Sequence, residues 1–397
     1  MPRLKQLINA FTSAVLATAM LTCLFACGVR KDDRALALTA APEAIFTNTP
    51  HADSSFGISA HSAILIEMSS GTAVYQKNAD ERLPMASTTK IMTALVALES
   101  CDTDRVVTVS PEAVGVEGSS IYLFAGERIT MEDLLYALLL SSANDAAAAI
   151  AIEIGGSIEG FADMMNARAR EMGLVSTHFT NPHGLYDEDH YTTARELAII
   201  AREAMAHPTF AKIVSTYKKT AAMTSGEASR LFVNHNKLLQ RYNGACGIKT
   251  GFTKKSGRCL VSCAERDGLA FLCVTLNAPD DWRDHVAMLD LGFSLYERKT
   301  LYDAGELKFT LPVVSGMDDA VTVTNTHAVE LIMPRDGRIP ECIIELPRFA
   351  YADITEGQIM GYAVFVINGR EVARCPLAAQ YSVKKRVNKP KFFSLLD

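Results

Sequence analysis

The chain has 397 residues, of which 49% are hydrophobic and 21% charged, with a formal net charge of −6 and an isoelectric point near 5.9. These values are typical of a globular protein and exclude a low-complexity one, and an acidic chain without runs of Lys or Arg argues against a nucleic-acid partner. At about 150 residues per domain, the length predicts two or three domains. A mean hydropathy of +0.11 leaves a membrane protein open until the apolar residues are located.

Much of the contiguous apolar sequence lies at the N-terminus. Arg3 and Lys5 precede an uncharged stretch over residues 7–26, so residues 1–27 are predicted to be an export signal. The sequence L-F-A-C, ending at Cys27, resembles a lipoprotein cleavage site. Lipidation of Cys27, ordinary cleavage and an uncleaved anchor all stay open. No later apolar run approaches the ~20 residues needed to span a bilayer, so only an N-terminal tether is expected, followed by a linker over residues 28–57.

The region from residue 58 to residue 298 mixes short strand-like runs with helical periodicity. Two apolar runs around Ser70-Gly71 predict a hairpin over residues 62–74. The predicted helices cover 87–98, a Leu-rich segment starting near Thr130, 144–155, 158–172, 193–207 (ended by Pro208) and 281–296. Two apolar strands after Gly251, joined by a turn at 265–268, predict a second, buried hairpin.

Residues 299–385 show alternation of apolar and polar residues with frequent turns and little sign of helix. Asn368-Gly369, between two strand-like runs, is the strongest short hairpin signal in the chain. This part is therefore predicted to be a second, all-β domain, with residues 386–397 as a tail.

Seven cysteines follow the export segment, and no C-x-x-C pair occurs among them. Cys259 and Cys263 lie four residues apart in an apolar run, where strand alternation points both side chains the same way. We interpret both as small buried core residues. The absence of C-x-x-C gives no support for a zinc ribbon or a thioredoxin-like site.

The motif S-x-x-K occurs at Ser87, Ser215 and Ser382, so by itself it has little weight. Only Ser87 opens a predicted buried helix, which places Ser87 and Lys90 on one helix face. The helix N-terminus favours negative charge developing on the serine oxygen, and a lysine in an apolar cleft can lose its proton and act as a base.

Two further short motifs each occur once in the chain. Ser142-Ala143-Asn144 lies between two predicted helices, where it could present a hydroxyl and an amide to a cleft or simply cap a helix. Lys249-Thr250-Gly251 precedes the second hairpin. It could bind a carboxylate while the glycine permits a close backbone approach, or it could be an ordinary polar strand start.

The order S-x-x-K, S-x-N, K-T-G, with separations of 55 and 107 residues, resembles the penicillin-binding, active-site serine family. Over residues 58–298 the chain is most similar to the low-molecular-mass D-alanyl-D-alanine carboxypeptidases, peptidase family S11. P-M-A-S-T-T-K-I-M-T-A-L from Pro84, N-P-H-G-L from Asn181 and G-I-K-T-G-F-T from Gly247 carry the same resemblance.

The resemblance implies an α+β fold: a β-lactamase/transpeptidase-like catalytic domain, with an antiparallel sheet, flanking helices and a helical subdomain, followed by a small all-β domain. It also implies a serine-type carboxypeptidase that removes the terminal D-Ala from peptidoglycan pentapeptide stems and is acylated by β-lactam antibiotics. No metal or other cofactor is expected, and His178, His183 and His190 are interpreted as loop and packing residues. An extracytoplasmic location follows from the export segment.

The resemblance also implies catalytic roles. Ser87 would attack the carbonyl of the penultimate D-Ala, Lys90 would accept its proton and Ser142 would pass a proton to the leaving amine. The backbone N–H groups of Ser87 and Phe252 would form the oxyanion hole. Water would then hydrolyse the acyl-enzyme.

The remaining implied residues bind substrate. Asn144 would hydrogen-bond the substrate amide, Lys249 would supply positive potential and Thr250 would bind the terminal carboxylate, next to Gly251. One position departs from the family pattern: an arginine that members can carry before K-T-G is His235 here, which predicts either weaker carboxylate binding or a greater reliance on Thr250.

Two alternatives stay open from the sequence. A class A-like β-lactamase would need an additional glutamate between S-x-N and K-T-G, and the nearest candidate, Glu196, lacks the expected following Asn and lies in a predicted helix. A catalytically idle, cell-wall-binding lipoprotein is the other alternative, which the intact motifs disfavour.

Overall fold

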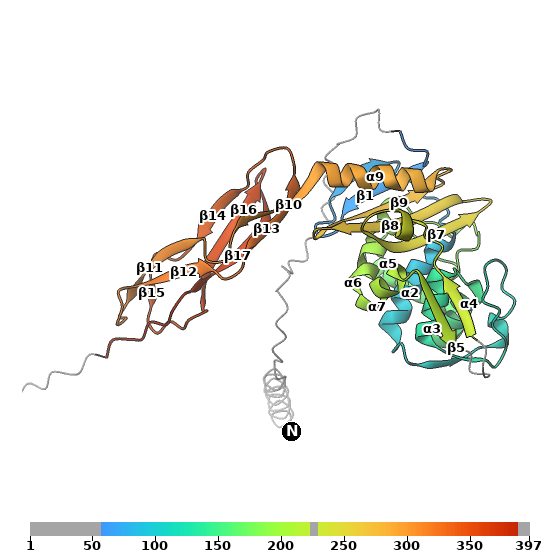
Figure 1. The fold of residues 1–397 in the computed structure, drawn as a ribbon. Helices are drawn as coiled ribbons and strands as arrows, with labels where there is room; N and C mark the ends of the chain where they lie inside the picture. The colour runs from blue at the N-terminus through green and yellow to red at the C-terminus, as the bar shows by residue number, and fades with distance from the viewer. Residues whose placement is uncertain (1–56, 223–228, 388–397) are drawn as a thin grey trace, which may run out of the picture. The chain divides into compact units, whose positions relative to one another are not determined.

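The computed structural model describes residues 57–222 and 229–387 (Figure 1). The predictions for the export signal over 1–27, Cys27, nearly all of the 28–57 linker and most of the tail lie outside the described residues. Within the described ranges, no helix is both long enough and apolar enough to cross a bilayer.

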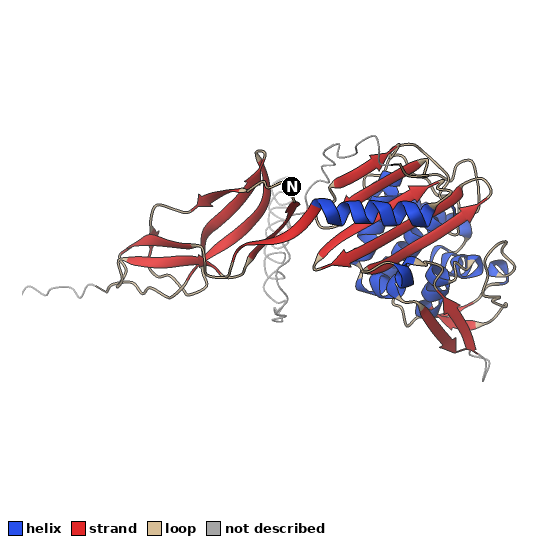
Figure 2. Ribbon diagram, turned by 45° about the horizontal axis from the view of Figure 1, so that its top comes forward, coloured by secondary structure: helices blue, strands red, loops and turns tan. Residues whose placement is uncertain are grey.

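A five-stranded antiparallel sheet forms the centre of the catalytic domain (Figure 2). Its strand order is β2-β1-β9-β8-β7, so the predicted N-terminal hairpin pairs with the hairpin that follows K-T-G. The strands are β1 (Ser62–Glu67), β2 (Ala73–Lys77), β7 (Ala245–Thr253), β8 (Gly257–Arg266) and β9 (Leu269–Leu276). Both predicted hairpins are confirmed, and β7 lies at one edge of the sheet.

The sheet is apolar on both faces, which explains the nearly continuous hydrophobic runs in its sequence. Ile64 and Ile66 of β1 join the large core beneath the helices, whereas Ala63 and Leu65 between them join a second core with α9 (Asp281–Leu295). Successive strand residues point to opposite faces, so one strand serves both cores.

The helices between β2 and β7 are α2 (Lys90–Ser100), α3 (Met131–Leu140), α4 (Asn144–Gly155), α5 (Ile158–Glu171), α6 (Ala194–Ala206), α7 (Pro208–Ser215) and α8 (Leu238–Arg241), with the short strands β3 (Val106–Thr108), β4 (Arg128–Thr130), β5 (Lys218–Ala222) and β6 (Ser229–Val233). The predicted helices are confirmed, including the Thr130 cap, which accepts a hydrogen bond from the Asp133 backbone N–H. The elements in this region that were not predicted from the sequence are α7, the short helix α8 and the strands β3 to β6. Pro208 ends α6 as predicted, but it also starts a new helix, because proline fits the first helical turn.

The C-terminal domain is all-β, as predicted. Its strands are β10 (Tyr296–Tyr302), β11 (Lys308–Val314), β12 (Ala320–Asn325), β13 (Val329–Pro334), β14 (Glu341–Glu345), β15 (Ala350–Tyr351), β16 (Ile359–Ile367) and β17 (Arg370–Ala379). Asn368 and Gly369 turn β16 into β17, both with positive φ as this tight turn requires. The predicted domain boundary between residues 298 and 299 falls within β10.

Cys263 is buried in the core, as predicted, but it also forms a disulfide with Cys246 that was not predicted from the sequence. Cys246 lies at an irregularity in the β7–β8 ladder that brings the two Cα atoms to 5.5 Å. Cys259 is a free buried cysteine, as predicted. Sequence spacing could not reveal the disulfide, because it depends on the register between two strands.

We expect loss of this disulfide to destabilise the catalytic domain. The cross-link joins residues 17 apart, and closing a loop of that size stabilises a fold by about 3 kcal/mol through the entropy of the unfolded chain. The double variant Cys246→Ala, Cys263→Ala should therefore show an earlier guanidinium unfolding midpoint, and Cys101→Ala should not. A reductant should shift the wild-type midpoint and leave the double variant unchanged; equal shifts in both would contradict the expectation.

Candidate active site

Ser87 and Lys90 lie together where the chain enters its most buried helix. Ser87 belongs to the 3-10 helix η1 (Ala86–Thr89), which continues directly into α2. The Lys90 Nζ lies 2.9 Å from the Ser87 Oγ, as the i, i+3 spacing predicts. Lys90 is fully buried, whereas Ser87 is half-buried and so accessible to a substrate.

The Lys90 amine has two further partners, the Asn144 Oδ1 and the His183 carbonyl oxygen, each at 2.7 Å. Burial lowers the pKa of Lys90 well below its ordinary value, and the nearby Lys249 ammonium lowers it further, while Asp145 opposes the shift. The surroundings of Lys90 therefore favour the neutral amine, which is the form that can take a proton from a serine.

The predicted S-x-N turn connects α3 to α4 and faces Lys90. Ser142 is buried and has φ +59°, a left-handed conformation that costs a non-glycine residue of order 1–3 kcal/mol. Asn144 receives Lys90 on its Oδ1 and donates from its Nδ2 to the Glu117 carbonyl. An amide nitrogen has two protons, so Asn144 keeps one for a substrate.

Asp145 is a site residue that sequence reasoning missed. Its carboxylate is buried and accepts hydrogen bonds from the Ser120 hydroxyl and from the backbone N–H groups of Ile121 and Leu123. These bonds fix the loop that precedes α3, and the Asn144 backbone N–H donates to Ser119 of the same loop. The sequence feature that could have revealed Asp145 is a charged residue in the first turn of an otherwise apolar helix.

The loop around His183 is the second missed component. The His183 carbonyl accepts from Lys90, and the Ser87 hydroxyl lies 3.5 Å from the same oxygen. Gly184 has φ +86°, and a Cβ there would lie 1.9 Å from the Ala86 carbonyl oxygen. Burial lowers the pKa of His190 to about 4, and this ring bonds Thr89 and Thr180, so it is a packing residue as predicted.

The K-T-G motif lies within the edge strand β7, directly ahead of the β8–β9 hairpin as the sequence predicted. Gly251 lies directly against Ser87, since a Cβ built there would be 3.0 Å from the Ser87 backbone nitrogen. Lys249 is 1% exposed, and burial lowers its pKa to about 7. Thr250 is half-buried and Phe252 is 65% exposed.

The segment before K-T-G is held in place by side-chain hydrogen bonds to nearby backbone groups. The Asn234 side chain donates to the Val214 and Thr216 carbonyls, and the Asn236 side chain caps Leu238. Burial, followed by repulsion from Lys249, lowers the pKa of His235. The lowered pKa makes His235 less charged at pH 7 than a free imidazole, so it does not supply the constant charge of an arginine.

Glu196, the candidate for a β-lactamase glutamate, has a structural role. Its carboxylate accepts from the backbone N–H groups of Val175 and Ser176 and from the Thr177 hydroxyl. These contacts occupy both oxygens in holding the loop before Thr177.

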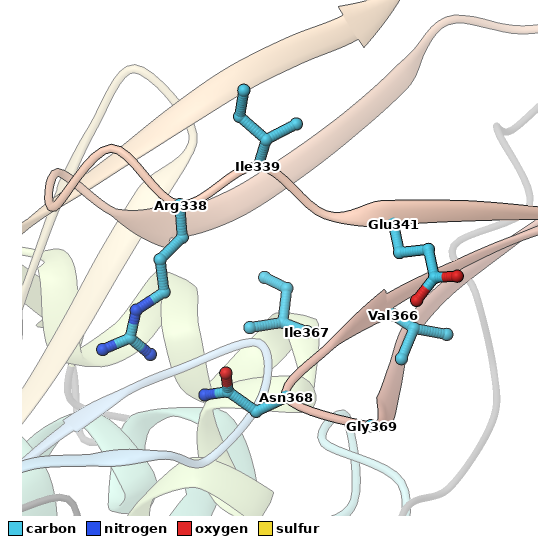
Figure 3. A pocket seen from close by; sticks show the side chains of 7 residues that line it. All are labelled: Arg338, Ile339, Glu341, Val366, Ile367, Asn368 and Gly369. Atoms are coloured by element: carbon cyan, nitrogen blue, oxygen red, sulfur yellow. The ribbon is translucent and has the colours of Figure 1, made fainter.

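A separate hollow of about 370 Å³ occurs in the β domain, between the β13–β14 connection and the β16–β17 turn (Figure 3). It contains none of the motif residues. Its lining is Arg338, Ile339, Glu341, Val366, Ile367, Asn368 and Gly369, and Arg338 is paired with Asp336.

The fold and the site define a serine hydrolase of the acyl-enzyme class, in which a serine, a buried lysine and a K-T-G edge strand meet. Residues 47–280 match the family Peptidase S11, D-alanyl-D-alanine carboxypeptidase. The chain is 34% identical to D-alanyl-D-alanine carboxypeptidase DacF of Bacillus subtilis, over 88% of this chain and 92% of that protein.

Solved structures agree with these sequence matches. Penicillin binding protein 5 from Haemophilus influenzae superimposes with a TM-score of 0.63 at 26% identity, over 83% of this chain and 98% of that one. The Streptomyces K15 DD-transpeptidase gives a TM-score of 0.58 at 34% identity, over 60% of this chain and 98% of that one. The chain therefore belongs to the peptidase S11 family and is a serine-type D-Ala-D-Ala carboxypeptidase.

Proposed function

We propose that Ser87 is the nucleophile and Lys90 the general base of this carboxypeptidase. The Ser87 oxygen attacks the carbonyl carbon of the penultimate D-Ala, and its proton passes to the Lys90 amine. The tetrahedral intermediate collapses to an acyl-Ser87 ester as the terminal D-Ala leaves with a proton delivered through Ser142. Water then hydrolyses the ester and regenerates the serine.

The three partners of Lys90 are the observation that carries this proposal. A neutral amine has two protons and one lone pair. It can donate both protons to Asn144 and the His183 carbonyl and accept the proton of Ser87 on its lone pair. The surrounding acceptors thus orient the lone pair of Lys90 at the hydroxyl that must lose its proton.

The substrate contacts follow from β7. Lys249 provides positive charge in a site shielded from water, Thr250 offers its hydroxyl to the terminal carboxylate and Gly251 lets the strand approach Ser87. The backbone N–H groups of Ser87 and Phe252 receive the oxyanion. Asn144 donates its free amide proton to the substrate amide.

We further propose that residues 1–27 export the chain and that the mature protein is held at the outer face of the cytoplasmic membrane by its N-terminus. The charged start, the apolar stretch and Cys27 support this location. If lipidation of Cys27 provides the tether, Cys27→Ser should move the protein from the membrane fraction to the soluble fraction. Membrane retention of Cys27→Ser would indicate that the uncleaved segment can act as an anchor, and a wild-type protein found in the soluble fraction would indicate ordinary cleavage.

The pH profile of kcat/KM for D-Ala release should be bell-shaped. Lys90 must be neutral, so the rate rises as it loses its proton, whereas Lys249 must be charged, so the rate falls above its pKa of about 7. Because a guanidinium stays charged, Lys249→Arg should move the falling limb upward by at least about one pH unit. Lys237→Arg, on an exposed lysine, should not. A falling limb that stays in place in Lys249→Arg would assign it to another group.

Release of D-Ala from a pentapeptide ending in D-Ala-D-Ala tests the peptide specificity of the site. The expected result is D-Ala release together with slow turnover of penicillin. Rapid penicillin turnover without D-Ala release would indicate a β-lactamase, and neither reaction would indicate a catalytically idle wall-binding protein.

A further inference from the structure

We infer that Lys254 and Lys255, in the turn between β7 and β8, form a cationic subsite for an acidic group on the substrate peptide, two to three residues upstream of the cleaved bond. The inference rests on the proposed function, because it requires the peptide to lie along β7. It adds a determinant of specificity outside the three motifs.

The direction of β7 fixes which part of the peptide reaches the turn. With the terminal carboxylate at Thr250 and the reacting carbonyl at Ser87, opposite Gly251, the residues upstream of the cleaved bond continue along the strand past Phe252 and Thr253. A strand rises about 3.3 Å per residue, so the turn begins roughly 10 Å beyond Gly251. That distance corresponds to about three peptide residues.

Lys255 contacts the loop that carries His183. Its Nζ is 5.5 Å from the centre of the Tyr186 ring, and Tyr186 is 46% exposed. Tyr186 follows His183, whose carbonyl contacts Lys90 and Ser87, and hydrogen bonds from the Asn181 amide to Leu185 and from the Gly184 N–H to Asn181 brace the loop between them. Lys255 therefore contacts the same loop whose His183 carbonyl lies beside Ser87 and Lys90.

The charges of Lys254 and Lys255 are available to a ligand. Both are exposed, and within residues 57–222 and 229–387 neither forms an ion pair of 4.0 Å or less. Asp187, which follows Tyr186, accepts the Asp189 backbone N–H and so is directed into its own loop. In a peptidoglycan stem peptide, a γ-linked D-glutamate lies two residues before the penultimate D-Ala and is thus the third residue upstream of the cleaved bond. Its free α-carboxylate is the acidic group that fits the distance.

The test compares two acetylated pentapeptides that end in D-Ala-D-Ala and differ only at the γ-linked D-glutamate, whose α-carboxylate is free in one and amidated in the other. The double variant Lys254→Gln, Lys255→Gln is compared with the wild type and with Lys299→Gln, Lys308→Gln, which removes the same charge from exposed lysines of the β domain. Penicillin acylation is measured on all three proteins.

We expect the wild type to favour the free carboxylate, and the double variant to lose about 3- to 10-fold in kcat/KM on that peptide alone, as expected for one or two exposed charge pairs. Equal losses on both peptides, a retained preference, or the same loss in the β-domain variant would each overturn the subsite. Failure of the proposed function would look different, since D-Ala release and penicillin acylation would then be absent from the wild type.

Discussion

Ser87→Ala should abolish covalent labelling by penicillin and reduce D-Ala release by at least on the order of 10³-fold, because the proposed acyl-enzyme forms on the Ser87 hydroxyl. The chain carries its own matched control. Ser215 also begins an S-x-x-K sequence, but it is the last residue of α7, and Lys218 is the first residue of β5. The two side chains therefore do not share a helix.

Ser215→Ala should accordingly keep wild-type labelling and wild-type D-Ala release. Each variant loses one hydroxyl, that of Ser87 bonded to Lys90 at 2.9 Å and that of Ser215 bonded to the Lys212 carbonyl at 3.1 Å. The free energy of unfolding should therefore fall by about 0.5 to 1.5 kcal/mol in each. Persistent labelling in Ser87→Ala would refute the assignment of the nucleophile. Lost labelling in Ser215→Ala would show that the second motif takes part.

Lys90→Ala should slow penicillin acylation by about 10²- to 10⁴-fold, the range over which a positioned general base acts. It also leaves the Asn144 Oδ1 and the His183 carbonyl without their donor in a buried site, so the free energy of unfolding should fall by about 1 to 3 kcal/mol. A stopped-flow acylation assay and a denaturant titration measure the two effects separately.

Lys90→Arg distinguishes a base from a structural donor. The guanidinium can still donate hydrogen bonds, but it does not lose its proton at accessible pH. If Lys90 is the base, the arginine variant should acylate as slowly as Lys90→Ala despite its retained donors. Acylation near the wild-type rate in a folded Lys90→Arg protein would contradict the role of base and leave Lys90 as a positioning residue.

Some contacts of the active site follow from local sequence, and others depend on the tertiary structure. Ser87 and Lys90 are three residues apart at a helix start, so helix geometry alone predicts their contact. Lys249 is 159 residues further along the chain from Lys90. The motif order and the family resemblance anticipated its place in the site. The lowered pKa of each lysine, however, comes from its burial in the folded protein, which no local sequence pattern specifies.

The groups that sequence reasoning missed are backbone groups and supporting side chains. The His183 carbonyl contacts Lys90 only because Gly184, with a positive φ, lets its loop pass against Ala86. Asp145 fixes the neighbouring loop through backbone N–H groups, which have no sequence identity of their own. A motif search reads side chains and therefore passes over contacts of this kind.

The composition and the local sequence determined a globular chain with an apolar N-terminal segment, the secondary structure around the site and the three motifs, because hydrophobic periodicity, turn residues and helix caps act over a few residues. Tertiary structure decided the rest. The disulfide between Cys246 and Cys263 depends on the register of β7 and β8, and the placement of Gly251 against Ser87 depends on packing the edge strand onto η1. Both bring together residues far apart in sequence, and only the folded sheet determines which of them meet.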